Sequence, residues 1–254
     1  MILAINIGNS NIIFGLHDGE KFVLSSRIKT EPLRTETEHA VLFSNIMRIN
    51  KIDCGEITGA VISSVVPGLT NVVKKAIGIL GDIPVTVVAP GVKTGLNIRI
   101  DDPASLASDH CCTAVGAISK YPLPAIIIDL GTATKITVVN EKREYIGGSI
   151  APGVMVSLGA LANSAALLPA IDITGELKVI GTETTQAMLS GILLGTASML
   201  DGMIGRFEKE IGKVKTVVAC GGLAKTIAPY CERDIIIDRD LLLDGLLAIY
   251  KKNM

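Results

Sequence analysis

A polar residue at the end of an apolar strand, followed by glycine and a hydroxyl side chain, occurs twice in this chain, 123 positions apart. The first copy runs from Ile2–Ile7 into Gly8-Asn9-Ser10-Asn11, and the second runs from Ala125–Ile128 into Asp129-Leu130-Gly131-Thr132. A second strand, a charged turn and a third strand follow in each copy, and Asp18-Gly19 in the first is a typical hairpin turn. This repeat predicts two similar halves.

Strand patterns alternate with helical patterns along the rest of the chain, which predicts an α/β fold. We expect helices at Thr37–Ile49, Leu69–Leu80, Ala104–Ser119, Thr182–Ile211 and Leu241–Lys251. Further strands are expected at Ile12–Leu16, Lys21–Ile28, Gly59–Val65, Pro84–Val88, Lys215–Cys220 and Asp234–Ile237. The prolines at 122 and 124 mark the break between the halves, and we assign residues 1–118 to an N-terminal domain and 119–254 to a C-terminal domain.

Charge and composition exclude several classes of partner. With 24 basic and 25 acidic residues and 3% aromatics, the chain lacks the surface expected for nucleic-acid binding, and no polybasic membrane surface is predicted. The apolar stretch Ala187–Leu200 is too short to span a bilayer and is expected to be a buried helix. Five cysteines without a C-x-x-C pair suggest neither disulfides nor zinc, so we expect a cytoplasmic protein. The 48% apolar content leaves room for a partner subunit.

The two glycine turns point to phosphate binding. Glycine lets main-chain N–H groups approach an anion, Ser or Thr hydroxyls donate to phosphate oxygens, and a carboxylate can hold a cation. Either turn alone is read more simply as an ordinary tight turn, but two copies favour phosphate. A third signal, Cys220-Gly221-Gly222-Leu223, would let a nucleoside approach the backbone, or is simply a strand-to-helix turn. Neither a Walker motif nor a dinucleotide fingerprint is present.

Acidic and basic side chains give fewer signals. Asp109 could act as a general base toward a substrate hydroxyl, although from the residues alone an exposed helix aspartate is the simpler interpretation. We expect His17 and His39 to be exposed, and no spacing links the three histidines into a metal site.

Seven motifs occur in the order and spacing of one family. They are Asn6-x-Gly-Asn-Ser-Asn, Ile62-Ser-Ser-Val-Val-Pro67, Pro90-Gly-Val-Lys-Thr-Gly95, Asp109, Asp129-x-Gly-Thr-Ala-Thr134, Gly147-Gly-x-Ile-Ala-Pro-Gly153 and Gly221-Gly-Leu223. On these residues, over nearly its whole length, the chain resembles type III pantothenate kinases. The resemblance implies two related actin-, hexokinase- and ribonuclease H-like domains, each a mixed five-stranded sheet with helices, flanking a nucleotide cleft. It also implies a homodimer that phosphorylates pantothenate in coenzyme A biosynthesis, using ATP, Mg²⁺ and K⁺ or NH₄⁺.

The resemblance carries roles to particular residues. It makes Asp109 the proton acceptor, Asp129 the ligand of the monovalent cation, and Thr184 a substrate contact often reached in the dimer. The remaining implied contacts are with ATP (Asn6, Gly8, Asn9, Ser10, Asn11, Thr132, Gly221 and Gly222) and with the acceptor substrate (Gly95, Ala107, Ser108, Asp109 and His110).

Five positions depart from the family pattern. Asn6 stands in place of an aspartate and weakens Mg²⁺ binding, because it carries no charge. His110 and Ile100 replace an arginine and a tyrosine of the substrate pocket, while Lys135 and Thr137 replace an uncharged polar residue and an aspartate. These departures leave open an impaired nucleotide- or pantothenate-binding regulator, and a kinase for a different hydroxyl acceptor.

Lys135 admits two interpretations. Its ammonium group could take the place of the monovalent cation beside Asp129 and make activity independent of potassium. Strand alternation puts it on the face opposite Thr134, where a lysine pointing into solvent is the simpler interpretation.

Overall fold

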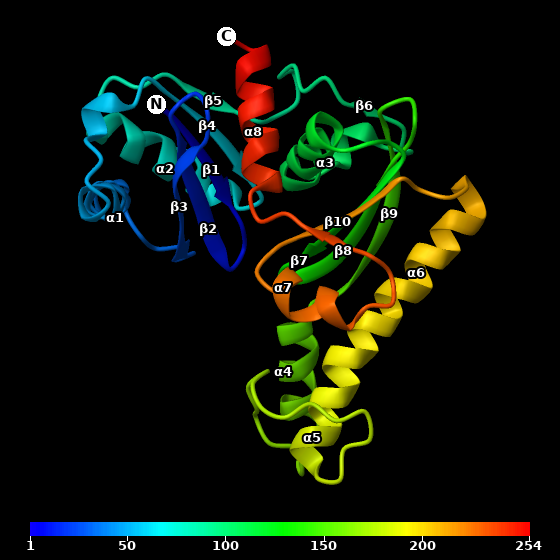
Figure 1. The fold of residues 1–254 in the computed structure, drawn as a ribbon. Coiled ribbons are helices and arrows are strands. Elements are labelled where there is room, and N and C mark those ends of the chain that lie inside the picture. Colours follow the sequence, from blue (N-terminus) through cyan, green and yellow to red (C-terminus); the bar gives the residue numbers. More distant parts are fainter. The chain divides into compact units, whose positions relative to one another are not determined.

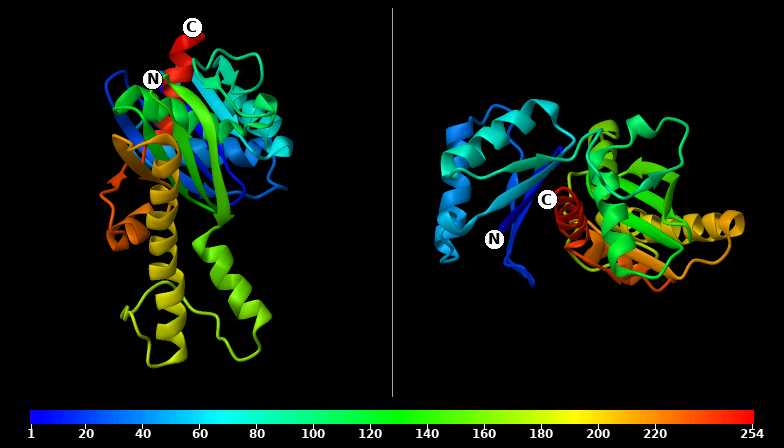
Figure 2. Two further views of the ribbon diagram at one scale, coloured as in Figure 1. Left: turned by 90° about the vertical axis from the view of Figure 1, so that its right-hand side faces the viewer. Right: turned by 90° about the horizontal axis from the view of Figure 1, so that it is seen from above.

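A computed structural model describes residues 1–254 as an α/β protein with two mixed sheets (Figures 1 and 2). Internal contacts divide the chain into two compact units. Unit 1 holds Met1–Asn97, Asp101–Lys120 and Asp240–Met254, and unit 2 holds Ile98–Ile100 and Tyr121–Arg239. The expected boundary at 118/119 falls next to the passage from unit 1 to unit 2 after Lys120, and the C-terminal segment groups with unit 1.

Unit 1 is built on a five-stranded sheet with the order β3-β2-β1-β4-β5. β1 pairs antiparallel with β2 and parallel with β4. The strands are β1 (Ile2–Ile7), β2 (Asn11–His17), β3 (Phe22–Lys29), β4 (Gly59–Ser64) and β5 (Val85–Val87). The helices are α1 (Glu36–Ile49), α2 (Pro67–Leu80), α3 (Ser108–Lys120) and α8 (Leu241–Lys252), with short 3₁₀ turns at Cys54–Glu56 and Pro103–Ser105.

Successive side chains of β1 lie on opposite faces of the sheet and belong to two different clusters of buried residues. Leu3, Ile5 and Ile7 are fully buried with side chains of α1 and α2. Ala4 lies on the other face and packs with residues of α3 and α8. By the same alternation Asn6, two residues further along, belongs to the face that α3 and α8 cover. The polar residue that ends β1 is thus directed to the side of the sheet that carries α3.

Two glycines allow α3 and α8 to pack closely. A Cβ atom on Gly116 of α3 would meet the carbonyl oxygen of Leu241, and a Cβ atom on Gly245 of α8 would meet the carbonyl oxygen of Cys112. Only glycine lets the two backbones approach this far. This contact fixes the position of the helix that carries Asp109.

Unit 2 is built on a six-stranded sheet with the order β11-β10-β7-β8-β9-β6, not the five strands expected. The additional edge strand, β6, has two residues and is too short to produce a periodic pattern in the sequence. The strands are β6 (Asn97–Ile98), β7 (Ala125–Leu130), β8 (Ala133–Val139), β9 (Glu144–Pro152), β10 (Thr216–Cys220) and β11 (Ile236–Ile237). The helices are α4 (Val154–Ser164), α5 (Thr184–Leu189), α6 (Gly195–Ile211) and α7 (Ala224–Ile227), with a 3₁₀ turn at Ala228–Tyr230.

Unit 2 contains one helical segment of 28 residues. α5 and α6 join through a π-helical turn, Ser190–Leu194, into one helix, Thr184–Ile211, which is long and apolar enough by length and composition to cross a membrane. Its buried residues pack with β7, β8 and α4 in the core of unit 2, but only 39% of its most apolar window is buried, so the expected buried helix is buried on one face only. Together α4 and α5 extend beyond the sheet of this unit (Figures 1 and 2).

Candidate functional site

The first glycine turn is a tight connection between β1 and β2. The Gly8 N–H donates to the Asn11 carbonyl at 3.0 Å, and the Thr30 hydroxyl donates to the Gly8 carbonyl at 2.7 Å. Asn9 and Ser10 are exposed at the tip of the turn. The predicted phosphate loop is therefore closed at its base, and its tip is open to a ligand.

Asn6 lies at the base of this turn with an unsatisfied acceptor. On the sheet it stands between Ile13 of β2 and Ser63 of β4, and it is 6% exposed. Its side-chain oxygen Oδ1 is buried without a hydrogen-bond partner. Buried acceptors usually find a donor, so an orphaned one next to a candidate phosphate loop fits a hydrated Mg²⁺, whose water ligands are donors.

Ser108 ties the start of α3 to the end of β4. Its hydroxyl accepts from the Ser63 hydroxyl at 2.9 Å and from the Ser64 N–H at 3.1 Å, and donates to the Ser64 carbonyl at 3.0 Å. The next residue, Asp109, is only 9% exposed, so the expectation of an exposed aspartate is wrong. The His110 N–H donates to Asp109 Oδ1 at 2.8 Å. A buried carboxylate is thus held in a fixed orientation in the first turn of α3.

The cysteines that follow Asp109 are not candidates for acid–base chemistry. Burial raises the pKa of Cys111 to about 11, against a smaller opposing effect of a hydrogen bond with Thr94. Burial also raises the pKa of Cys112 well above its ordinary value. Both remain thiols at neutral pH, so neither supplies a thiolate base in this turn.

The other predicted substrate residues of unit 1 lie around the same turn. Ala107 and His110 flank Ser108 and Asp109 and are half-buried. Gly95 follows Thr94, whose side chain contacts Cys111, and adopts a φ of +72°. Unit 1 therefore brings together Asn6, the glycine turn and the segment 107–110, which are far apart in the sequence.

The second glycine turn, between β7 and β8, is supported by a glycine from another motif. The Gly131 N–H donates to the Ala133 carbonyl at 3.2 Å, and the Gly153 N–H donates to the Thr132 carbonyl at 3.1 Å. A Cβ atom on Gly153 would meet that same Thr132 carbonyl oxygen. The Gly147–Gly153 motif thus serves to hold the Thr132 loop, a role that the sequence alone did not reveal.

The double glycine at 221–222 packs against the end of β7, next to the same loop. Gly221 has a φ of +91°, and a Cβ atom there would lie 2.6 Å from the Leu130 carbonyl oxygen and 2.7 Å from Asp129 Oδ1. The Leu223 N–H donates to the Leu130 carbonyl at 3.3 Å. Because β10 and β7 are parallel neighbours, their carboxyl ends bring the two glycine motifs of unit 2 together.

Asp129 and Lys135 form an ion pair. Lys135 Nζ lies 2.8 Å from Asp129 Oδ2, and the two side chains are 15% and 20% exposed. The interpretation of Lys135 as a solvent-facing lysine is therefore wrong.

The two other departures from the family pattern in this unit are Thr137 and Ile100. Thr137 is buried on the same face of β8 as Lys135, with its hydroxyl 3.5 Å from the Ile127 carbonyl. Ile100 lies against Gly147.

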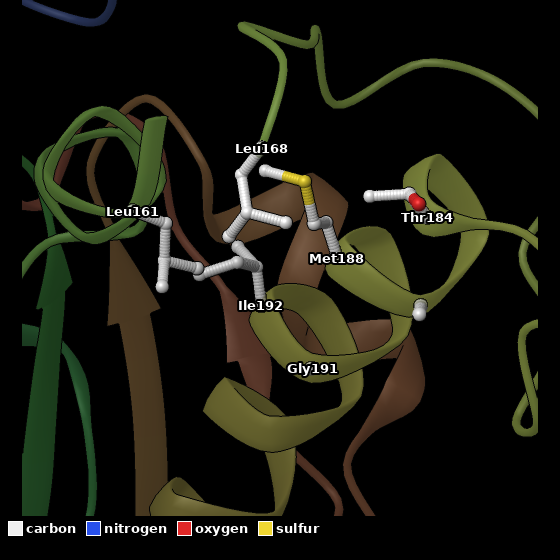
Figure 3. Close-up of a pocket in the computed structure, with 7 residues that line it drawn as sticks. Leu161, Leu168, Thr184, Met188, Gly191 and Ile192 are labelled. Atoms are coloured by element: carbon white, nitrogen blue, oxygen red, sulfur yellow. The ribbon is translucent and has the colours of Figure 1, made fainter. Parts of the chain in front are cut away.

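Thr184 is the first residue of α5, and this helix lies beyond the end of the sheet of unit 2 (Figure 1). It stands at the edge of a pocket of about 520 Å³, with Leu161, Leu168, Met188 and Ile192 gathered beside it (Figure 3). The lining includes Gly191 of the π-helical turn, a feature that often marks functional sites. Apart from Thr184, the side chains that line the pocket are apolar and none is charged, so it suits an apolar part of a ligand and not a triphosphate.

Solved structures share the fold at low sequence identity. A ROK family glucokinase from Streptomyces griseus in complex with glucose and AMPPNP matches 99% of this chain and 98% of its own, with a TM-score of 0.56 and 12% identity. Component A of the Acidaminococcus fermentans (R)-2-hydroxyglutaryl-CoA dehydratase matches 99% and 98%, with a TM-score of 0.52 and 17% identity. These likenesses confirm the expected actin/hexokinase-like fold.

Related proteins match this chain along its full length. The sequence pattern of the type III pantothenate kinase family matches residues 2–206. Type III pantothenate kinases from Exiguobacterium sp. and Halalkalibacterium halodurans are 39% and 40% identical, over 100% of this chain and 99% and 100% of theirs. The chain thus belongs to the type III pantothenate kinase family of ATP-dependent small-molecule kinases, which act on pantothenate in coenzyme A biosynthesis.

Proposed function

We propose that Asp109 is the proton acceptor in the phosphorylation of pantothenate. The carboxylate takes the proton of the acceptor hydroxyl as the hydroxyl oxygen bonds to the γ-phosphorus of ATP, and the bond from the γ-phosphorus to the bridging oxygen breaks to release ADP. The observation that carries this assignment is the burial of Asp109 in a turn that Ser108 fixes to β4. Fixing the base in advance supplies the positioning on which phosphoryl transfer depends.

ATP is assigned to the glycine turns. The turn Gly8-Asn9-Ser10-Asn11 and the Thr132 hydroxyl bind phosphate oxygens, and Gly221-Gly222 accepts the adenosine. The open tip at Asn9 and Ser10 supports the first assignment. The contacts of Gly153 and Gly221 with the Thr132 loop support the others, because they gather three glycine-rich segments at one strand end. That both turns bind one nucleotide stays a prediction.

Mg²⁺ is assigned to Asn6, which would hold it through a water ligand. The buried, unpartnered Oδ1 supports this, since it can accept from a metal-bound water. When bound, the ion neutralises negative charge on the transferring phosphate. Asn6 supplies no charge of its own, so it orients the ion's water more weakly than an aspartate would.

The acceptor substrate is assigned to Gly95, Ala107, Ser108 and His110 of one protomer and to Thr184 of a second. The position of α5, which begins with Thr184, beyond the end of the sheet of its unit (Figure 1) supports a role in a neighbouring protomer. Exposed apolar side chains of α4 and of the segment between α4 and α5 suit a homodimer interface: Met155, Val156, Leu161, Leu167, Val179 and Ile180. The free cysteines are in keeping with a cytoplasmic location.

A coupled assay of ADP release tests the assignment of Asp109. We expect turnover with pantothenate and a loss of about 10²-fold or more in Asp109→Asn, a typical loss for a general base. Asp101→Asn, an exposed aspartate before the same helix, is the matched control and should keep the wild-type rate. ATP binding without turnover would indicate a regulatory binding protein, and turnover only with another hydroxyl acceptor would indicate a changed substrate; either result would contradict the proposal.

A further inference from the structure

Lys135 stands directly opposite Asp129 in the sheet of unit 2. The two residues are cross-strand partners in the antiparallel pairing of β7 with β8, so their side chains leave the sheet on the same face. Both strands lie inside the sheet, with β10 beyond β7 and β9 beyond β8. The 2.8 Å ion pair between Lys135 Nζ and Asp129 Oδ2 is therefore built on the two most central strands, where the register is fixed on both sides.

The two oxygens of Asp129 face different neighbours. Oδ2 is paired with the ammonium group. Oδ1 lies toward Gly221 and Gly131, 2.7 Å from the position that a Cβ atom would take on Gly221 and 3.5 Å from the same position on Gly131. An unneutralised carboxylate here would repel a phosphate bound at Thr132, three residues further on. A positive charge at Asp129 is thus required for anion binding at this loop, and Lys135 already supplies one.

Asp129 and Lys135 together do not fit a monovalent metal cation in addition to the ammonium group. The charges of Asp129 and Lys135 cancel, and Thr137, the next residue on this face of β8, is buried and uncharged. A second cation near Asp129 would meet the ammonium group. At a separation of about 4 Å and an effective dielectric constant near 20, this repulsion weakens binding of the second cation by roughly a thousandfold.

We propose that Lys135 takes, as a fixed ammonium group, the place at Asp129 that the family resemblance assigns to K⁺ or NH₄⁺, so that this kinase needs no monovalent cation. The proposal rests on the proposed function for its kinetic consequence. Its consequence for cation binding is independent of turnover. A tethered ammonium group stays in place at any potassium concentration, so Asp129 is neutralised permanently.

The kinetic test compares buffers containing tetramethylammonium, Na⁺, K⁺ or NH₄⁺ as the only monovalent cation. The wild-type rates should agree within about twofold in all four. Lys135→Thr should lose about tenfold or more in tetramethylammonium, the scale of one preorganised charge, and regain activity in K⁺. Lys135→Arg keeps the charge and should remain insensitive to K⁺. Lys142→Thr removes an exposed lysine from the β8–β9 turn and is the matched control, expected to behave as wild type.

The binding test needs no catalysis. Tl⁺, a potassium analogue observable by NMR, should bind to Lys135→Thr and be displaced by K⁺, and K⁺ should raise the melting temperature of this variant but not that of the wild type. Activation of the wild type by K⁺ of about tenfold or more, or K⁺-displaceable Tl⁺ binding to it, would overturn the proposal. These wild-type results test the proposal even if Lys135→Thr does not fold. A protein without kinase activity but with the expected Tl⁺ pattern would refute the proposed function and leave the cation assignment standing.

Discussion

The hydroxyl of Ser63 donates a hydrogen bond to the hydroxyl of Ser108 at 2.9 Å, which links the end of β4 to the residue before Asp109. With the two bonds to the Ser64 main chain, the Ser108 hydroxyl uses its one donor and both acceptor positions. A change at Ser108 should therefore affect catalysis through the position of Asp109.

We predict that Ser108→Ala lowers kcat about tenfold and lowers the free energy of unfolding by about 1–3 kcal/mol, because it leaves buried polar groups unpaired. Steady-state kinetics and urea unfolding measure the two effects. Ser105→Ala is the matched control, since the Ser105 hydroxyl donates to the Asp102 carbonyl in an exposed turn. If the two variants lost equal activity, the Ser63–Ser108 link would have no role in positioning the base.

Asn6→Asp should raise kcat by about tenfold or more and lower the Mg²⁺ concentration needed for half-maximal rate. The new carboxylate stands where a buried oxygen lacks a partner, and it adds the charge that orients a divalent ion. Without Mg²⁺ the variant should be less stable than the wild type, because the charge is desolvated. Asn71→Asp adds the same charge at an exposed position of α2, outside the predicted site residues, and should change neither kcat nor the Mg²⁺ requirement. An unchanged or lower rate in Asn6→Asp would refute this role.

Gly221→Ala should be more destabilising than Gly212→Ala and should also weaken ATP binding. Both glycines have positive φ, +91° and +85°, so an alanine strains the backbone at either position. Only Gly221 faces close neighbours, whereas a Cβ atom on Gly212 would have no atom within 4 Å. Urea unfolding and ATP titration compare the variants, and equal stability would show that the contact with the β7 end can relax.

Stability should fall with acidification because of His39. Its ring is fully buried against Phe43, and both ring nitrogens lack hydrogen-bond partners, so the expectation that it is exposed is wrong. Burial lowers its pKa below the ordinary 6.5; Arg34 acts in the same direction and Glu38 opposes it. Below pH 6.5 the unfolded chain therefore binds a proton that the folded chain resists.

The free energy of unfolding should decline by up to about 1.4 kcal/mol per pH unit as the pH falls from 6.5 toward the lower folded pKa. His39→Leu should remove this part of the slope in denaturant titrations and leave the dependence above pH 7 unchanged. An identical slope in the variant would show that His39 is protonated equally in both states.

Much of the fold could be predicted because local patterns and packing agree. The helix α1 begins one residue before the expected Thr37, because Thr35 and Glu38 form a capping box that starts it. The segment of α4 was not predicted as a helix, since its apolar residues are spread around it and several are exposed. His17 was expected in an exposed turn but is 9% exposed, with its ring edge against Phe22.

The site was harder to predict than the fold. Glycine turns have a local signature, so both loops could be named from the sequence. The ion pair of Lys135 depends on the register of β7 against β8, and the Ser63–Ser108 bond joins residues 45 positions apart. Neither relationship produces a local pattern, because cross-strand partners and helix-to-strand contacts are fixed only when the sheet has formed.

The most direct test of the central claim is ³¹P NMR of the reaction of ATP with pantothenate, carried out with the wild type and Asp109→Asn. The account predicts a phosphomonoester signal that grows with the ADP signals in the wild type and is absent over the same time in the variant, while both proteins bind ATP equally. A phosphomonoester formed equally fast by Asp109→Asn, or ADP formed by the wild type without phosphorylated pantothenate, would contradict it.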